Sequence, residues 1–268
     1  MKAIDSGILV TLLSLVLIVT SVGNTHAQFG VDDHTIAFYN FDTVSGKTVQ
    51  NEAGDAQLDG ELFGDAAVVL GEGQHGGGLV LDGAGDYLRV EPFGNPPEGT
   101  VELWFKVPDA TPSQKSLAPG VLWTLTSACK EYGEANDSPF IIATHTGIVH
   151  PNIWFGIWTD TWLVADSGVD AESLVGQWHH VAGTWGERGI EIYIDGELKG
   201  THKDFKDPLP DPTYTAWIIG SDSWQADVRG VIDGVRLSDT QRTATEFLLN
   251  LPVQPQGKLA VTWAGLKK

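Results

Sequence analysis

The segment IEIYIDGELK, residues Ile190–Lys199, alternates apolar and polar side chains and then reverses direction. Isoleucine occupies every second position from 190 to 194, and such alternation places one face of a β-strand in a core. Asp195-Gly196 follows, a residue pair that tolerates the positive φ angles of a two-residue hairpin turn. Glu197 begins the return strand. The segment therefore predicts an antiparallel hairpin with one buried face.

Short apolar or alternating runs of this kind continue from His34 to Asp239, separated by Gly, Pro, Asp or Asn. No long segment holds a helical period, which argues against alternating helices and parallel strands. The chain has 268 residues, 42% of them hydrophobic, with 32 Gly and 10 Trp. That composition is enough for one sizeable core and is typical of short strands joined by tight turns. We therefore predict an all-β fold, an antiparallel β-sandwich.

The charge balance excludes two classes of partner. Acidic residues number 35 against 16 basic ones, so the formal net charge is -19. Nucleic acids and anionic membrane surfaces attract cationic proteins, and this chain carries the opposite field. We expect neither as a partner.

The chain is expected to divide into three parts. Residues 1–27 predict a secretory signal, because the apolar run Ile8–Thr20 is too short to favour a spanning helix and ends near small residues. Residues 28–251 form the sandwich domain, and 252–268 form a linker and tail. The signal predicts a secreted protein, extracellular or periplasmic, with no membrane span after cleavage.

One short helix is expected near the carboxyl end of the domain. Thr243 and Glu246 have the spacing of a capping box, in which each residue satisfies the other's backbone N–H. Phe247, Leu248 and Leu251 would form its buried stripe. Pro252 would end it.

Four segments, in this order, resemble the LamG-type branch of the concanavalin A-like lectin/glucanase superfamily. They are AFYNFD (Ala37–Asp42), LVLDGAGDYL (Leu79–Leu88) leading to VELWF (Val101–Phe105), GQWHHVAGT (Gly176–Thr184) followed by IYIDG (Ile192–Gly196), and GVIDGVRLS (Gly230–Ser238). The resemblance implies a jelly-roll sandwich. It also implies a domain that binds carbohydrate or protein ligands, often with a structural calcium ion.

Tryptophans are the strongest candidates for ligand contact. Trp154, Trp158 and Trp162 share parity, and a turn at Thr159–Thr161 would make Trp158 and Trp162 cross-strand neighbours. A flat row of indoles stacks on sugar rings, while the nearby Asp160 accepts hydrogen bonds from hydroxyl groups. Trp224, in a polar loop, would flank the same surface. Core packing is the alternative, favoured for Trp154 and evenly balanced for the other three.

Calcium is the expected ion, because carboxylates lie at strand ends beside glycines. The resemblance implies that the first and last strands meet, which would bring Asp42 near Asp233, with Asp86 completing the site. An equally supported role for each Asp is turn formation.

Catalysis is not expected. Glu191, Asp195 and Glu197 lie at a hairpin tip, where solvent prevents the pKa shift that an acid catalyst needs. His179 and His180 are adjacent, so in a strand they point to opposite faces and cannot share one ion. The sequence therefore predicts an exported, non-catalytic binding module that recognises glycans. The alternatives are an adhesive module for a cell-surface protein and a divergent glycoside hydrolase or lyase.

Overall fold

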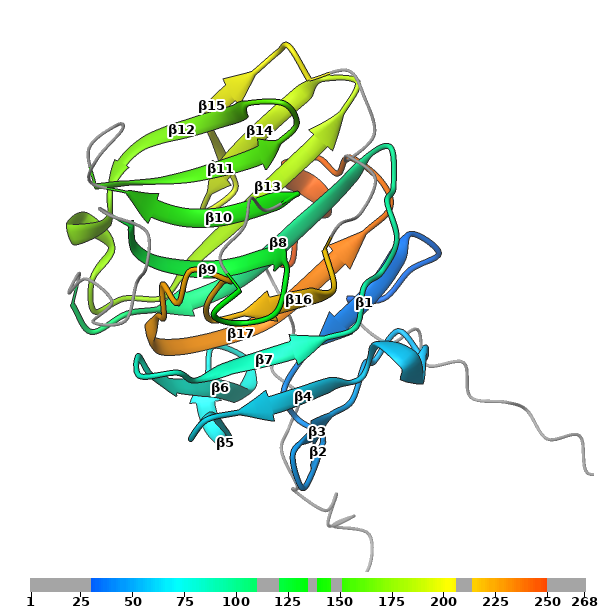
Figure 1. The fold of residues 1–268 in the computed structure, drawn as a ribbon, viewed down its shortest axis with the longest axis vertical. Coiled ribbons are helices and arrows are strands. Elements are labelled where there is room, and N and C mark those ends of the chain that lie inside the picture. The colour runs from blue at the N-terminus through cyan, green and yellow to red at the C-terminus, as the bar shows by residue number, and fades with distance from the viewer. Residues whose placement is uncertain (1–29, 110–120, 135–138, 146–150, 206–213, 250–268) are drawn as a thin grey trace, which may run out of the picture.

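The computed structural model describes residues 30–109, 121–134, 139–145, 151–205 and 214–249. The predicted signal 1–27 and the tail 252–268 lie outside these residues. Two antiparallel sheets are stacked face to face, so the predicted all-β sandwich is confirmed (Figure 1). None of the described helical segments is long and apolar enough to cross a membrane.

Sheet A has the strand order β15-β14-β13-β8-β17-β6-β5, and β1 pairs with β17 beside that path. Its strands are β1 (Thr35–Tyr39), β5 (Ala67–Gly73), β6 (Gly76–Asp82), β8 (Gly99–Lys106), β13 (His179–Gly186), β14 (Gly189–Ile194), β15 (Glu197–His202) and β17 (Arg229–Ser238).

Sheet B has the order β12-β11-β10-β9-β16-β7-β4-β3-β2. Its strands are β2 (Val44–Ser45), β3 (Thr48–Val49), β4 (Gly60–Phe63), β7 (Tyr87–Val90), β9 (Val121–Cys129), β10 (Phe140–His145), β11 (Asn152–Trp158), β12 (Trp162–Asp170) and β16 (Ala216–Ile219).

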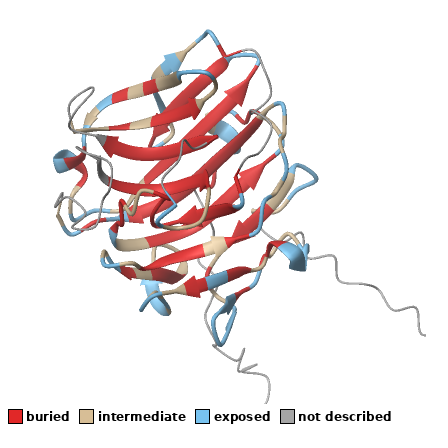
Figure 2. Ribbon diagram, viewed as in Figure 1, coloured by how far each residue is buried: buried red, intermediate tan, exposed pale blue. Residues whose placement is uncertain are grey.

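The core fills the space between the sheets. Its largest fully buried side chains include Trp123, Trp185 and Trp217, so these three indoles fill the sandwich. Figure 2 shows buried residues along the middle of the strands and exposed ones at the turns. The remaining surface for ligand contact is the outer face of each sheet and the loops at its rim.

The hairpin predicted at Ile190–Lys199 is present. Ile194 pairs with Glu197, and Asp195 and Gly196 have φ angles of 52° and 78°, which a two-residue turn of this hand requires. The isoleucines face the core as expected. Sequence alternation was therefore sufficient to place the turn, whereas the register shift between Ile192 and Tyr193 was not predicted.

The predicted carboxyl-terminal helix is reduced to one 3₁₀ turn, η3 (Ala244–Glu246). Thr243 N–H does donate to the Glu246 carboxylate, but Phe247 returns to extended backbone. The reason is tertiary: Leu248 N–H donates to Glu102, and Leu248 C=O accepts from Trp104 Nε1, each at 2.8 Å. The N–H and C=O groups of Leu248, which a longer helix would use in its own hydrogen bonds, are thus bonded to side chains of β8. Leu251 and Pro252 lie outside the described residues.

Two further 3₁₀ turns occur among the described residues, η1 (Ala56–Leu58) and η2 (Ala171–Leu174). In the first, the Asp55 carboxylate accepts from Gln57 N–H, as an N-cap does. The turn joins β3 to β4 at the end of sheet B farthest from β12. It forms one wall of a hollow that Glu91, Pro92 and Phe93 also line.

Candidate functional site

The hairpin of β11 and β12 brings Trp158 and Trp162 together. Thr159 N–H donates to Thr161 C=O, closing a three-residue turn, and the two tryptophans are direct cross-strand partners. Their ring centroids lie 5.4 Å apart. The predicted juxtaposition is therefore confirmed.

Trp154, Trp158 and Trp162 form one aromatic cluster on the outer face of sheet B, here called the tryptophan row. Residues 153, 155 and 157 of β11 are fully buried in the core, so the alternate positions face outward. All three indoles are half-buried, including Trp154, for which core packing had been favoured. The row occupies the surface of the sandwich rather than its interior.

The tryptophan row is not flat, which corrects the expectation of a coplanar platform. Trp162 stands at 67° to Trp158 and at 80° to Trp154, with a centroid distance of 5.8 Å in the second pair. Edge-to-face packing of this kind is the favoured geometry of aromatic pairs. A ligand would therefore meet a ridge of alternating ring faces and edges.

Gly156 makes this packing possible, and sequence reasoning missed it. A Cβ at this position would lie 2.5 Å from Trp154 Cζ3 and 3.2 Å from Trp162 Cε3. The two rings therefore occupy the space that any other side chain would fill. A glycine inside a strand was the available signal, since it often marks a close approach.

Polar groups lie at both ends of the row. Asp160, at the tip of the turn, is exposed. At the other end Asn152 Nδ2 lies 3.2 Å from an Asp166 oxygen, and the same carboxylate accepts from Gly168 N–H. Hydroxyl groups of a ligand can reach acceptors at either end of an apolar middle, as carbohydrate sites require.

Trp224 lies apart from the row. Its loop follows β16, and Ala226 C=O in that loop accepts from Thr124 N–H of β9. Strands β9 and β10 therefore separate the loop from β11. Trp224 N–H donates to the buried Asp222, which fixes the loop. Its role in ligand contact stays a prediction.

Asp42 and Asp233 come together as the sequence predicted, because β1 pairs with β17. Burial raises the pKa of Asp233 to about 7, and the nearby Asp42 charge contributes to the rise. Asp233 accepts from His75 N–H at 2.8 Å, and Asp42 accepts from Gly77 N–H at 2.9 Å. Both carboxylates thus lie beside the turn between β5 and β6, and their role as Ca²⁺ ligands stays a prediction.

Asp86 does not join that pair. Its carboxylate accepts from Asp65 N–H at 2.6 Å and Asp82 N–H at 2.9 Å, which holds the neighbouring turns. Burial raises its pKa. The described residues contain no cluster of three or more His, Cys, Asp and Glu side chains arranged to hold a metal. Any calcium ligands beyond Asp42 and Asp233 would be backbone carbonyls or water.

Carboxylates on the outer face of sheet A are buried and partnered. Glu191 is 6% exposed, contrary to the expected solvated hairpin. It accepts from Arg188 Nε at 3.0 Å and Tyr193 Oη at 2.9 Å. Phe247 packs against Tyr193 from outside, so the carboxyl-terminal segment covers this face. Sequence alternation could not show a cover supplied by a distant segment.

The two adjacent histidines point to opposite faces of sheet A, as predicted, and the cysteine Cys129 is buried. His179 Nδ1 lies 2.8 Å from Asp195, while His180 Nε2 lies 2.9 Å from Glu102 within sheet A. The rings contact Phe105 and Trp104 respectively, on opposite faces. Burial raises the pKa of the Cys129 thiol to about 12, so a thiolate does not form there at neutral pH.

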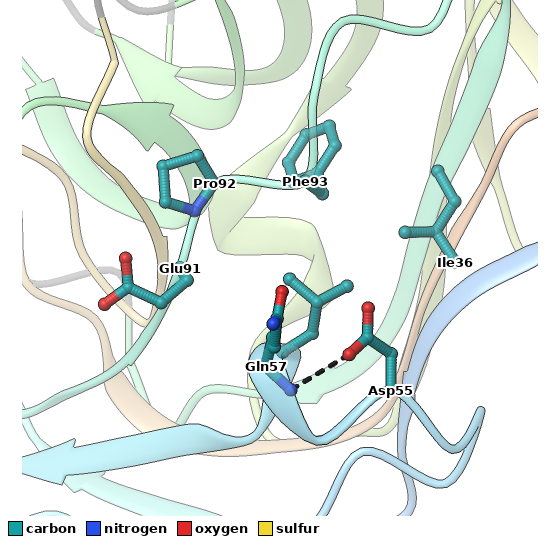
Figure 3. Close-up of a pocket in the computed structure, with 7 residues that line it drawn as sticks. Ile36, Asp55, Gln57, Glu91, Pro92 and Phe93 are labelled. Atoms are coloured by element: carbon teal, nitrogen blue, oxygen red, sulfur yellow. Dashed lines mark hydrogen bonds between the residues drawn. The ribbon is translucent and has the colours of Figure 1, made fainter.

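A hollow of about 710 Å³ lies at the other end of sheet B from the tryptophan row. Figure 3 shows Asp55 and Gln57 on one side and Glu91, Pro92 and Phe93 on the other. Both carboxylates already have partners. Asp55 caps η1, and Glu91 accepts from Arg89 at 2.7 Å. The hollow therefore offers fewer free polar groups than its volume suggests.

Comparison with known proteins gives a family and a fold. The sequence profile described as the concanavalin A-like lectin/glucanases superfamily matches residues 82–247, more than half of the chain. The comparison with curated proteins found no match.

Several solved structures are similar in fold. Domain 4 of AbnA, a GH43 extracellular arabinanase from Geobacillus stearothermophilus, in complex with arabinotriose, is 18% identical with a TM-score of 0.58, and the match covers 80% of this chain and 96% of that domain. The binding domain of Paraclostridial Mosquitocidal Protein 1 is 13% identical with a TM-score of 0.58, covering 80% of this chain and 51% of the other. Trypanosoma rangeli sialidase in complex with the inhibitor DANA is 16% identical with a TM-score of 0.55, covering 78% and 31%. At these identities the likeness establishes the fold.

Proposed function

The chain belongs to the concanavalin A-like lectin/glucanases superfamily, and from this membership we propose that it is an exported, non-catalytic module that binds carbohydrate. The solved structures similar to it include domain 4 of an arabinanase in complex with arabinotriose and a toxin's binding domain. These neighbours support a binding module. The ligand of this chain is inferred from its own surface.

The tryptophan row carries the proposal. Trp158 and Trp162 are adjacent, half-buried and backed by a core that fixes β11, so their ring positions are set before a ligand arrives. Aromatic surface flanked by acceptors suits a sugar, which has apolar ring faces and peripheral hydroxyls. Asp160 and the Asn152–Asp166 pair supply those acceptors.

The state of the sheet A carboxylates supports a non-catalytic role. A retaining or inverting glycosidase needs two carboxyl groups that flank the scissile bond. Glu102 and Glu191 are the buried glutamates of this face, and both are engaged in hydrogen bonds beneath the carboxyl-terminal segment. Neither is open to a substrate in this arrangement.

The test is glycan-array binding by the full chain and by the Trp158→Ala/Trp162→Ala variant. We expect the variant to lose at least about tenfold in affinity for any neutral glycan that the parent binds, since both ring contacts are removed. Melting temperature and circular dichroism establish that the variant is folded. Gln57→Ala, at the hollow of Figure 3, and Leu198→Ala, half-exposed on β15, are matched controls that should bind as the parent does.

The outcomes separate the alternatives. If Gln57→Ala loses glycan affinity and the tryptophan variant does not, the binding site lies in the hollow of Figure 3 and not at the tryptophan row. Capture of a purified cell-surface protein without any glycan signal would favour the adhesive alternative. Release of new sugar ends from a bound glycan would establish catalysis and overturn the proposal.

A further inference from the structure

A second hollow lies on the outer face of sheet A, away from the tryptophan row. Val80 of β6 pairs with Val231 of β17, which pairs in turn with Lys106 of β8, so these three side chains lie abreast on one face. Together with Arg229 and Glu72 they line a depression of about 280 Å³. Its floor is apolar and its walls are charged.

The charge at this hollow is unusual for the chain. The net charge is -19. Carboxylates hold the other ion-paired arginines of the described residues at 2.5 to 3.0 Å, namely Arg89, Arg188, Arg236 and Arg242. Lys106 makes no ion pair among the described residues. Arg229 has a 64% exposed side chain and meets Asp109 only at 3.6 Å. Two cations thus face one hollow with a single lining carboxylate, Glu72.

We propose that this hollow binds one carboxylate-bearing sugar residue of a glycan. Lys106 and Arg229 would hold the carboxylate through charge-assisted hydrogen bonds, which are about twice as strong as neutral ones. The valine floor would contact the apolar face of the sugar ring, and Glu72 would accept from hydroxyls. The choice of a sugar rests on the proposed function, whereas the preference for a carboxylate rests on this hollow alone.

The volume of the hollow and the net charge of the chain limit which ligands can bind there. About 280 Å³ is just below the usual range for pockets that hold drug-sized molecules, so one ring fits and a longer segment does not. The net charge of -19 repels a densely charged polyanion at a distance. The fitting ligand is therefore a mostly neutral glycan that carries an isolated uronic acid.

The experiment measures calorimetric affinity of the full chain for two probes. One is an oligosaccharide with a single glucuronic acid, and the other is its carboxyl-reduced, neutral analogue. We expect the parent to prefer the acidic probe by about tenfold at low salt, and this preference to shrink at about 0.3 M salt. Lys106→Gln/Arg229→Gln should abolish the preference, whereas Lys47→Gln/Lys203→Gln, at exposed lysines elsewhere, should keep it.

Three results would overturn the inference. The first is equal affinity of the parent for both probes, and the second is a preference for the acidic probe that survives Lys106→Gln/Arg229→Gln. The third is binding of a short acidic peptide that this variant loses, while the parent does not distinguish the two sugar probes. The Trp158→Ala/Trp162→Ala variant keeps the two proposals separable. Because the row and the hollow lie on the outer faces of different sheets, that variant should lose affinity for the neutral probe and keep its affinity for the acidic probe. Failure of the acid preference alone therefore leaves the glycan-binding row intact.

Discussion

The Glu102 carboxylate accepts two hydrogen bonds from the Arg236 guanidinium, from Nε at 2.8 Å and from Nη2 at 2.5 Å. Its other oxygen lies 2.9 Å from His180 Nε2 and accepts from Leu248 N–H. Neither oxygen is exposed. One carboxylate thus connects β8, β13, β17 and the carboxyl-terminal segment that covers them.

Replacing Glu102 with Gln should strongly destabilise the fold. The substitution leaves the Arg236 charge buried without its counter-charge, and breaking a buried pair in this way costs about 3–5 kcal/mol. Chemical denaturation should show that loss in the free energy of unfolding. Glu197→Gln is the matched control, because its carboxylate is 75% exposed and should contribute under about 1 kcal/mol. A Glu102→Gln variant as stable as the parent would show that the network is dispensable.

The same residue predicts a pH dependence in acid. Burial alone raises the pKa of Glu102, but the hydrogen bond with His180 and the charge of Arg236 together hold it below the ordinary value of 4.5. Between the folded pKa of Glu102 and its ordinary value of 4.5, the native state therefore binds fewer protons than the unfolded chain. The stability due to Glu102 is fully present above pH 4.5 and is lost as the pH falls through the folded pKa.

The measurement is the difference in unfolding free energy between parent and Glu102→Gln as a function of pH. That difference should be constant above pH 4.5 and should shrink below it. Asp222, whose pKa burial raises, acts in the opposite direction and is present in both proteins, so it cancels. A difference that grows in acid would contradict the assigned direction.

Local pattern predicted most of the fold and part of the site. The turn at Asp195-Gly196 and the pairing of Trp158 with Trp162 depend on spacing within one hairpin, which sequence displays directly. Opposed histidines at 179 and 180 follow from strand parity alone.

Contacts between distant segments escaped prediction. Glu191 is buried because Tyr193 beside it is covered by Phe247, and η3 stops after one turn because Leu248 bonds to Glu102 and Trp104. Asp86 binds its local turns instead of joining Asp42. In each case tertiary packing determines which partner the residue contacts, and local sequence periodicity carries no information about that partner.

Gly156→Ala should disturb the tryptophan row while leaving the sandwich folded. The added methyl would lie 2.5 Å from the Trp154 ring, so that ring must move. We expect a changed near-ultraviolet circular dichroism spectrum, a stability loss of about 1–3 kcal/mol and weaker glycan binding. Trp154→Phe in the Gly156→Ala background provides room and should restore part of the stability. An unchanged aromatic spectrum would show that the rings are not held as described.

Calcium remains a prediction, and its ligands can be tested individually. We propose that Asp42 and Asp233 hold Ca²⁺, since their carboxylates accept from His75 N–H and Gly77 N–H of one turn and the Asp42 charge acts on Asp233. Binding to the native state alone adds stability, about 2.7 kcal/mol at a concentration one hundred times the dissociation constant. A chelator should therefore lower the melting temperature of the parent, and excess calcium should restore it.

Asp233→Asn should abolish that response, because it removes one of the two proposed carboxylate ligands. Asp86→Asn should keep it, since Asp86 is committed to Asp65 N–H and Asp82 N–H and does not face the pair. Asp160→Asn, on an exposed turn, controls for the loss of one negative charge from the chain. Because each of the three variants replaces one carboxyl group with an amide, only a specific site separates them. If the parent melts at the same temperature with chelator and with calcium, the proposed calcium site is wrong. Both aspartates would then serve to form turns.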